Sequence, residues 1–160
     1  FLPYLMGERT PHNNPNARGT FVGMTLDTKR EDMTQAVLEG VAFALRDAFE
    51  ITKSLGMEIE RVRILGGGAK SPLWCKIIAN VLDVKVDKIS SEEGPAFGAA
   101  ILAAVGCGKY ASVEEASTKL IEITKTIEQS PETVELYNHK YEVFREIYPA
   151  LKDVYDKIVK

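Results

Sequence analysis

The residues best suited to chemistry in this sequence are three consecutive glycines, Gly66 to Gly68, between a β-branched apolar segment and an apolar helical pattern. Glycine lacks a Cβ, so a ligand can lie directly against its backbone, and it adopts angles closed to other residues. Ser71 and Pro72 follow, a pair typical of a helix N-cap and first helical position. The unpaired N–H groups of such a helix start favour an anion or a ribose above the loop. The alternative is a tight turn without a ligand.

The spacing of this run excludes two common nucleotide loops. Ala69, not a glycine, precedes Lys70, so the run lacks the order G-x-x-x-x-G-K-[ST] of a P-loop. The glycines are contiguous rather than spaced as G-x-G-x-x-G, and no acidic residue ends a clear next strand, as a dinucleotide-binding fold requires. The run therefore indicates a different family of nucleotide-binding folds.

Other polar residues are weaker candidates for a site. Glu8, Arg9 and His12 could form a hydrolytic cluster, but no serine or cysteine nucleophile with an orienting base lies in a matching motif. We expect this loop to brace the nucleotide side of a cleft instead. Arg18 is expected to form a surface contact, with a phosphate contact as the alternative. Glu39 is expected to make a structural contact, because a single helical carboxylate has no obvious chemistry.

Length and composition predict one globular domain and no nucleic-acid or membrane partner. The 160 residues are 45% hydrophobic, with a net charge of −3 and interspersed charges, so there is no basic stripe or polybasic patch. No apolar run approaches the roughly 20 residues of a membrane span. Cys75 and Cys107 lack metal or disulfide spacing and are expected to be small core residues. The composition is typical of a cytoplasmic protein, and the start at Phe1 predicts a piece of a longer chain.

The first third of the chain predicts a loop, a short strand and a long helix. Proline and asparagine fill residues 1–18, which predicts an ordered loop, and glycines flank apolar residues in a short strand over 19–25. The capping box Thr28-x-x-Glu31 precedes apolar residues at three- and four-residue steps, which predicts a helix over about 30–55. Small residues on its apolar face allow another backbone to approach closely.

The middle of the chain predicts half of a βαβ unit. Strands are expected at 61–65 and 84–89, with the glycine run and a helix between them. A helix opened by Glu93 and Gly94 is almost wholly small or apolar, so it is expected to be buried on most sides. A second capping box predicts a short helix from residue 112 to about 123.

A final helix is predicted over 131–160, with a kink at Pro149. Its apolar residues form a stripe at alternating three- and four-residue steps, which is expected to be core packing rather than a cofactor site. The members of this stripe are Val134, Tyr137, Tyr141, Phe144, Tyr148, Leu151, Tyr155 and Ile158.

Two segments, GTFVGM at 19–24 and DMTQAVLE at 32–39, together resemble the signature of the FGGY carbohydrate kinases. The opening run FLPYLMGERTPHNNPNARG, the glycine segment GGGAKSPLW and the segment EEGPAFGAAILA resemble the xylulokinase branch of that family in particular. The resemblance covers essentially the whole chain.

This resemblance implies an α/β fold, part of an actin-like (ribonuclease H-like) ATPase domain, helix-rich with a few short strands. Residues 1–160 would be the C-terminal part of the second, ATP-side domain, with sugar and ATP meeting in the cleft between two domains. The family's phosphate loops and catalytic aspartate would precede Phe1, so no catalytic base and no metal ligand is assigned here. The family's adenosine motif maps onto Gly66, Gly67, Gly68, Ala69, Ser71 and Pro72.

The resemblance also implies an activity and its partners. The intact enzyme would transfer the γ-phosphoryl group of ATP, with Mg²⁺, to a pentulose, converting D-xylulose to D-xylulose 5-phosphate. The alternative is a non-catalytic actin-like module for nucleotide binding or oligomerisation. We further expect self-association, for example as a homodimer, because strands 61–65 and 84–89 would lack neighbours and the aromatic stripe needs an apolar surface.

Overall fold

The computed structural model describes residues 1–90 and 94–158, and it is helix-rich with a few short strands, as expected. The chain divides into two compact units. The first comprises Phe1–Ile59, Asn80–Asp83 and Gln129–Lys160, and the second comprises Glu60–Ala79 and Val84–Glu128. In chain order the elements are α1 (Arg30–Ser54), β1 (Arg61–Ile64), the 3₁₀ helix η1 (Gly67–Lys70), α2 (Pro72–Leu82), β2 (Lys85–Ile89), α3 (Gly94–Gly106), α4 (Val113–Leu120), β3 (Ile123–Ile127) and α5 (Pro131–Ile158).

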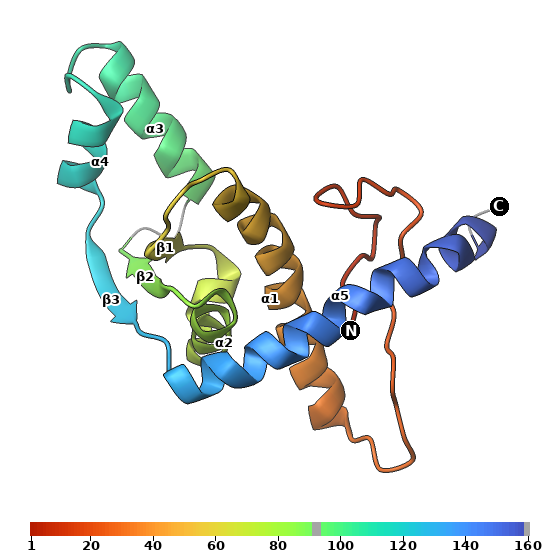
Figure 1. Ribbon diagram of the computed structural model, residues 1–160. Coiled ribbons are helices and arrows are strands. Elements are labelled where there is room, and N and C mark those ends of the chain that lie inside the picture. Colours follow the sequence, from red (N-terminus) through yellow and green to blue (C-terminus); the bar gives the residue numbers. More distant parts are fainter. Residues whose placement is uncertain (91–93, 159–160) are drawn as a thin grey trace. The chain divides into compact units, whose positions relative to one another are not determined.

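The core of the first unit lies where the two long helices α1 and α5 cross (Figure 1). Phe43 of α1 is buried against Tyr137, Tyr141 and Phe144 of α5, with ring centroids 5.9, 6.0 and 5.3 Å apart. Such tilted and edge-on ring pairs are favourable beyond the area they bury. The prediction that the aromatic stripe is core packing is confirmed.

The start of α1 differs by one residue from the sequence prediction. Lys29 is the N-cap, and its backbone N–H donates a 2.9 Å hydrogen bond to the Asp32 carboxylate. The Thr28 hydroxyl instead accepts from the backbone N–H of Thr25 at 2.8 Å, within the preceding turn. Further along the helix, a Cβ at Gly40 would collide with the backbone of Phe1, which confirms the expected close approach.

Residues 1–18 form an ordered loop, as predicted. Leu2 and Thr20 exchange backbone hydrogen bonds of 2.9 and 3.1 Å. The Asn14 amide donates to the Tyr148 hydroxyl of α5 at 2.9 Å. The strand expected over 19–25 is wrong, because Thr20 alone makes a bridge there and Gly23 takes a positive φ of 83°.

A buried carboxyl, Asp47, lies at the contact between α1 and α5. The Tyr141 hydroxyl donates a 2.7 Å hydrogen bond to it. Burial raises the pKa of the Asp47 carboxyl, and the nearby Glu8 charge raises it further. The Tyr141 hydrogen bond and the charges of His12 and Arg145 lower that pKa, but they do not outweigh burial. The cost of removing this charge from water therefore dominates.

We expect Asp47→Asn to make the protein more stable at pH 7. Asparagine keeps an acceptor for Tyr141 and removes the buried charge. Because the folded-state pKa is raised, the stability that Asp47 contributes is full below its unfolded pKa of about 4 and is lost as the pH rises through the folded pKa. Urea denaturation should therefore show an advantage of the variant at pH 7 that disappears near about pH 4. The exposed Asp153→Asn is the control, and a less stable Asp47→Asn protein at pH 7 would contradict this account.

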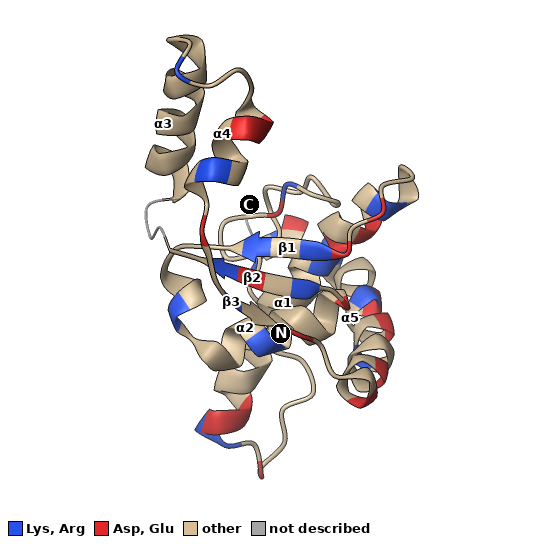
Figure 2. Ribbon diagram, turned by 90° about the vertical axis from the view of Figure 1, so that its left-hand side faces the viewer, with Lys and Arg blue, Asp and Glu red and all other residues tan. Residues whose placement is uncertain are grey.

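The second unit contains a three-stranded sheet in the order β1-β2-β3. β1 and β2 are parallel and are joined through η1 and α2, which confirms the predicted βαβ connection, and β3 pairs antiparallel with β2. Asp87 of β2 is fully buried and accepts from Arg61 of β1 at 3.1 Å and from Thr126 of β3 at 2.6 Å. This carboxylate thus ties all three strands together, and Figure 2 shows basic residues on β1 and β2.

Two predictions for the sheet are wrong. The helix expected to reach residue 123 ends at Leu120, and β3 follows it. The β-branched residues that make up most of ITKTI were the signal for this strand. The expectation that strands 61–65 and 84–89 lack neighbours is wrong for β2, which has a partner on both sides, whereas β1 is paired on one side only among the described strands.

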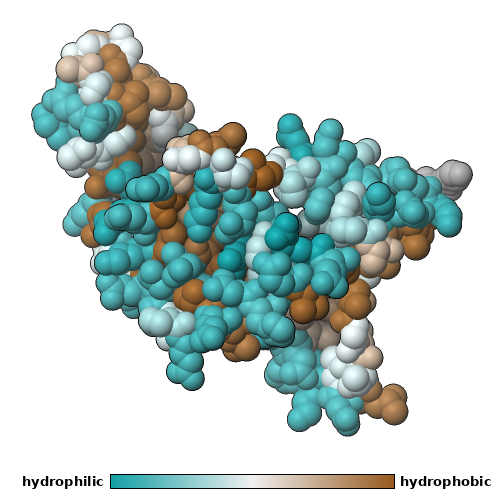
Figure 3. All heavy atoms as spheres, in the orientation of Figure 1, coloured by the Kyte–Doolittle hydropathy of each residue, from teal (hydrophilic) through white to brown (hydrophobic). Residues whose placement is uncertain are grey.

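Helix α3 is more exposed than its composition predicts. Ile101 is buried, but Leu102 is 61% exposed, and hydrophobic residues reach the surface of this helix in Figure 3. Among the described elements, α4 is the one that packs extensively on α3. Cys107, at the end of α3, is exposed, so its assignment to the core is wrong, whereas that of Cys75 is confirmed. Glu93 lies outside the described residues.

The last helix runs to Ile158 with Pro149 inside it, and residues 159–160 lie outside the described part. The expected kink stays a prediction. Most of the stripe is covered within the unit, for example by the His12 ring, which stacks on Tyr148 with centroids 3.7 Å apart. The argument from the aromatic stripe is therefore removed, the open side of β1 remains, and self-association stays a prediction. None of the described helices is both long and apolar enough to span a membrane.

Candidate functional site

The glycine run forms a compact turn at the carboxyl end of β1. Gly66 follows the strand with a φ of 80°, an angle that favours glycine. The 3₁₀ helix η1 then closes through backbone hydrogen bonds of 3.1 Å from Ala69 to Gly66 and from Ser71 to Gly68. The turn brings the chain directly to the start of α2.

The predicted helix start is confirmed. Pro72 is the first residue of α2, and the Ser71 hydroxyl accepts a 3.2 Å hydrogen bond from the backbone N–H of Trp74. The Cys75 thiol lies beneath the turn, 3.6 Å from the Ala69 carbonyl oxygen. Burial raises the pKa of the Cys75 thiol, so it remains a neutral packing group.

The three glycines serve different purposes. A Cβ at Gly66 or Gly67 would meet nothing within 4 Å, so the space above both is open. A Cβ at Gly68 would collide with the indole ring of Trp74. Gly66 alone of the three has a positive φ. Gly67 and Gly68 therefore do not use the angles open to glycine, and Gly68 is required by packing.

A pocket of about 190 Å³ lies beside this turn. Of the residues predicted to bind a nucleotide, Gly66 and Ala69 line it, whereas Gly67, Gly68, Ser71 and Pro72 do not. Sequence reasoning missed the rest of the lining, which comes from the turn, from β1 and β2 and from β3: Ile64, Leu65, Lys70, Lys88, Ile89, Ser90 and Thr124. These lining residues could have been predicted from their position at or after the ends of the two expected strands, since ligands bind at the carboxyl ends of parallel strands.

The described residues fit one part of a nucleotide. Open backbone at Gly66 and Gly67 allows close approach, and the start of α2 directs the positive end of its helix dipole at the same turn, although Pro72 has no N–H and the Trp74 N–H is bonded to Ser71. Lys88 lines the pocket and brings a positive charge that suits phosphate. Its volume is below the roughly 300–1,000 Å³ of complete ligand pockets. These residues can therefore hold a portion of a nucleotide, not all of it.

The other polar candidates have structural partners. The Glu8 carboxylate accepts from the backbone N–H groups of Thr10 and His12 within its own loop. Glu39 accepts from the Tyr137 hydroxyl at 3.1 Å and pairs with Lys140 at 3.1 Å, which confirms its structural assignment.

Arg18 donates to two carbonyl oxygens of its own loop, those of Pro15 and Ala17, at 2.9 and 2.8 Å. In the part of the chain that the structure describes, no cluster of histidine, cysteine or carboxylate side chains could hold a metal ion.

A family model matches most of the chain, and the matched residues include this turn. Residues 1–107 match the model of the FGGY family of carbohydrate kinases, C-terminal domain. The chain belongs to the FGGY family. Its fold is accordingly that of an actin-like ATPase domain, and the family is one of carbohydrate kinases.

Individual relatives match nearly the whole chain. A xylulose kinase from Staphylococcus epidermidis is 37% identical over 154 residues, covering 96% of this FGGY chain and 31% of that protein. The crystal structure of a ligand-bound xylulose kinase from Lactobacillus acidophilus superimposes with a TM-score of 0.89 at 29% identity, over 98% of this chain and 32% of that one. A gluconate kinase from the same organism gives a TM-score of 0.88 at 29% identity, with the same coverage. The chain thus spans about a third of the length of these relatives.

Proposed function

We propose that this chain is the nucleotide-side part of an ATP-dependent sugar kinase whose acceptor is a pentulose, with D-xylulose as the substrate and D-xylulose 5-phosphate as the product. The observation that carries the proposal is the open glycine turn before a capped helix. In phosphoryl transfer the protein mainly positions groups and neutralises charge, which backbone N–H groups and lysines can do.

Each group of the turn has a specific task in this proposal. The backbone of Gly66 and Gly67 lies against the nucleotide, because no side chain occupies the space above it. The start of α2 places the positive end of the helix dipole at the same turn. Lys88 adds positive charge at the pocket. Bound ATP supplies the phosphoryl group, and Mg²⁺ is proposed to accompany its phosphates.

The proposal assigns residues 1–160 to the C-terminal part of the second domain of the kinase. No residue of this chain is proposed as the catalytic base, because no aspartate here lies in the family's Gly-Asp-Asn or Gly-Asp-Gln context. The base and most sugar contacts are proposed to come from the remaining two thirds of the protein. The similarity to xylulose kinases across nearly the whole chain supports the pentulose, and gluconate is the second candidate acceptor because a gluconate kinase matches almost as well.

Phosphoryl transfer by the intact protein tests the proposal directly. With MgATP, we expect a kcat/KM for D-xylulose at least about tenfold above that for D-gluconate, since roughly 1.4 kcal/mol of differential transition-state binding gives that ratio. The reverse preference would replace the pentulose with gluconate. ADP binding without turnover of either sugar would favour a non-catalytic nucleotide-binding module. Absence of both binding and turnover would overturn the proposal.

A further inference from the structure

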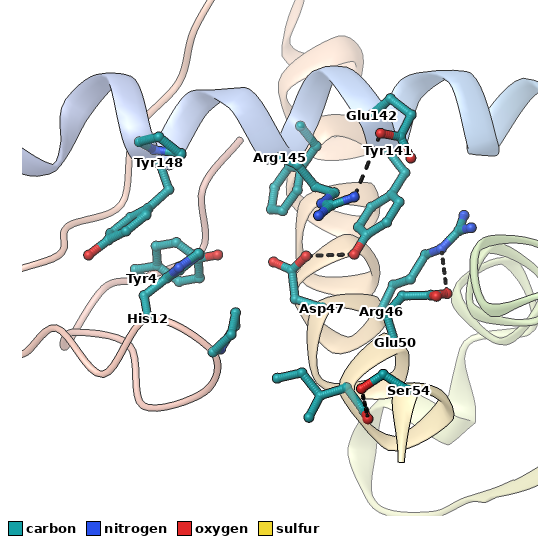
Figure 4. A pocket seen from close by; sticks show the side chains of 14 residues that line it. Tyr4, His12, Arg46, Asp47, Glu50, Ser54, Tyr141, Glu142, Arg145 and Tyr148 are labelled. Carbon is teal, nitrogen blue, oxygen red and sulfur yellow. Dashed lines mark hydrogen bonds and ion pairs between the residues drawn. The ribbon is translucent and has the colours of Figure 1, made fainter. Parts of the chain in front are cut away.

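A second pocket lies in the first unit, between the N-terminal loop and the helices α1 and α5 (Figure 4). Its volume is about 530 Å³, within the usual range of roughly 300–1,000 Å³ for small-molecule sites. It shares no residue with the pocket beside the glycine turn. The function proposed above makes no use of it.

Two polar groups in this pocket are buried without hydrogen-bond partners. Tyr4 is only 5% exposed, and its hydroxyl has no partner among the described residues. Figure 4 shows that hydroxyl on the side of the ring that faces Asp47. The Nη1 atom of Arg46 is also buried and unpaired. Unpaired buried polar groups reduce stability, so a ligand that pairs with them after a small side-chain adjustment gains affinity.

Aromatic rings form one wall of the same pocket. The His12 ring stacks on Tyr148 with centroids 3.7 Å apart, and Tyr4 meets both rings edge-on at 5.8 and 6.0 Å. This wall offers an apolar surface to the C–H groups of a ligand. Apolar walls with a few converging polar groups are typical of small-molecule sites.

The charges in the pocket favour a neutral ligand. Arg46 pairs with Glu50 at 3.4 Å, and Arg145 pairs with Glu142 at 3.7 Å. Asp47 remains as an additional carboxyl between them, so an anion would be repelled by it, and a cation would face two guanidinium groups. Hydroxyl groups suit this mixture because each can both donate and accept.

We propose that this pocket binds a small neutral polyol, either a free sugar or a sugar alcohol, at a site separate from the glycine turn. Its hydroxyls accept from Arg46 and exchange a hydrogen bond with the Tyr4 hydroxyl. Another hydroxyl donates to the Asp47 oxygen that Tyr141 does not use. The C–H face of the polyol packs on the aromatic wall.

Hydrogen–deuterium exchange on the intact protein locates the binding, with xylitol as the sugar alcohol, D-xylose as the free sugar and inorganic phosphate as the anion. We expect one or both neutral probes, but not phosphate, to protect peptides from residues 1–18 and 137–149. The neutral probe that protects at the lower concentration shows whether the natural ligand is a sugar alcohol or a free sugar. Protection elsewhere in the protein, for example at the acceptor site of the kinase, does not affect this readout.

Tyr4→Phe tests the contact itself. The substitution should lower the affinity for the protecting probe about three- to tenfold, the usual effect of losing one hydrogen bond. The free protein should unfold at the same or a higher temperature. Tyr137→Phe is the matched control, because its hydroxyl contacts Glu39 and does not line the pocket. Equal affinity in wild type and Tyr4→Phe, protection by phosphate in preference to both polyols, or no protection at concentrations that saturate a millimolar site would each overturn the proposal. Turnover of D-xylulose is measured in parallel, so a failure of the kinase proposal remains distinguishable.

Discussion

Gly68→Val is expected to destabilise the second unit by about 1–3 kcal/mol, the usual cost of overpacking. The reason is that a Cβ at this position enters the space of the Trp74 indole ring. The ring must then move away from the turn that it covers, and the loop in front of α2 loses its packing. Chemical denaturation of the intact protein measures the loss.

Gly67→Ala is the matched comparison, since a Cβ at Gly67 meets nothing within 4 Å. Its stability should be unchanged or higher by about 0.4–1 kcal/mol, because alanine restricts the unfolded chain. If a nucleotide lies on this backbone, the added methyl group reduces ADP affinity, which calorimetry detects. The pair thus separates a packing glycine from a ligand-facing one.

A double substitution tests the role assigned to Trp74. Combining Gly68→Ala with Trp74→Ala should cost less than the sum of the two single changes, because the ring that the new Cβ meets is gone. Additive losses would show that Gly68 is required for a reason other than this ring. ADP affinity lost in Gly67→Ala but kept in Gly68→Ala would support the division between the two glycines.

Phe43→Ala is expected to have the largest effect on stability, a loss of about 3–5 kcal/mol. Phe43 is 5% exposed and packs against three rings of α5, so the change leaves a cavity at the crossing of the two helices. Urea denaturation should show a lower midpoint. Leu45→Ala on the same helix is the control. Because Leu45 is 49% exposed, this variant should lose much less stability than Phe43→Ala.

The same variant distinguishes a core from a docking surface. If the aromatic stripe of α5 is covered within one chain, Phe43→Ala lowers the stability of the protein at any concentration. A stripe that instead bound a second copy would make the effect depend on protein concentration, because dissociation would then be coupled to unfolding. Sedimentation equilibrium beside the denaturation curves separates these outcomes.

Local patterns in the sequence determined much of this fold. The long helices followed from apolar residues at three- and four-residue steps, and the start of α2 followed from Ser71 and Pro72. The family followed from motifs carried by short contiguous segments. Such features depend on neighbours in the chain, so they can be inferred without knowing the tertiary structure.

Other features were decided only by tertiary contacts. The sequence shows three equivalent glycines. In the structure, α2 places the Trp74 indole ring against Gly68, so Gly68 is a packing residue, whereas the space above Gly67 is open. The composition of α3 predicts burial, yet Leu102 of this helix is exposed. Tyr4 and Asp47 are far apart in sequence and line one pocket because the N-terminal loop packs against α1 and α5. Which side chains meet is set by long-range packing, and local periodicity carries no information about it.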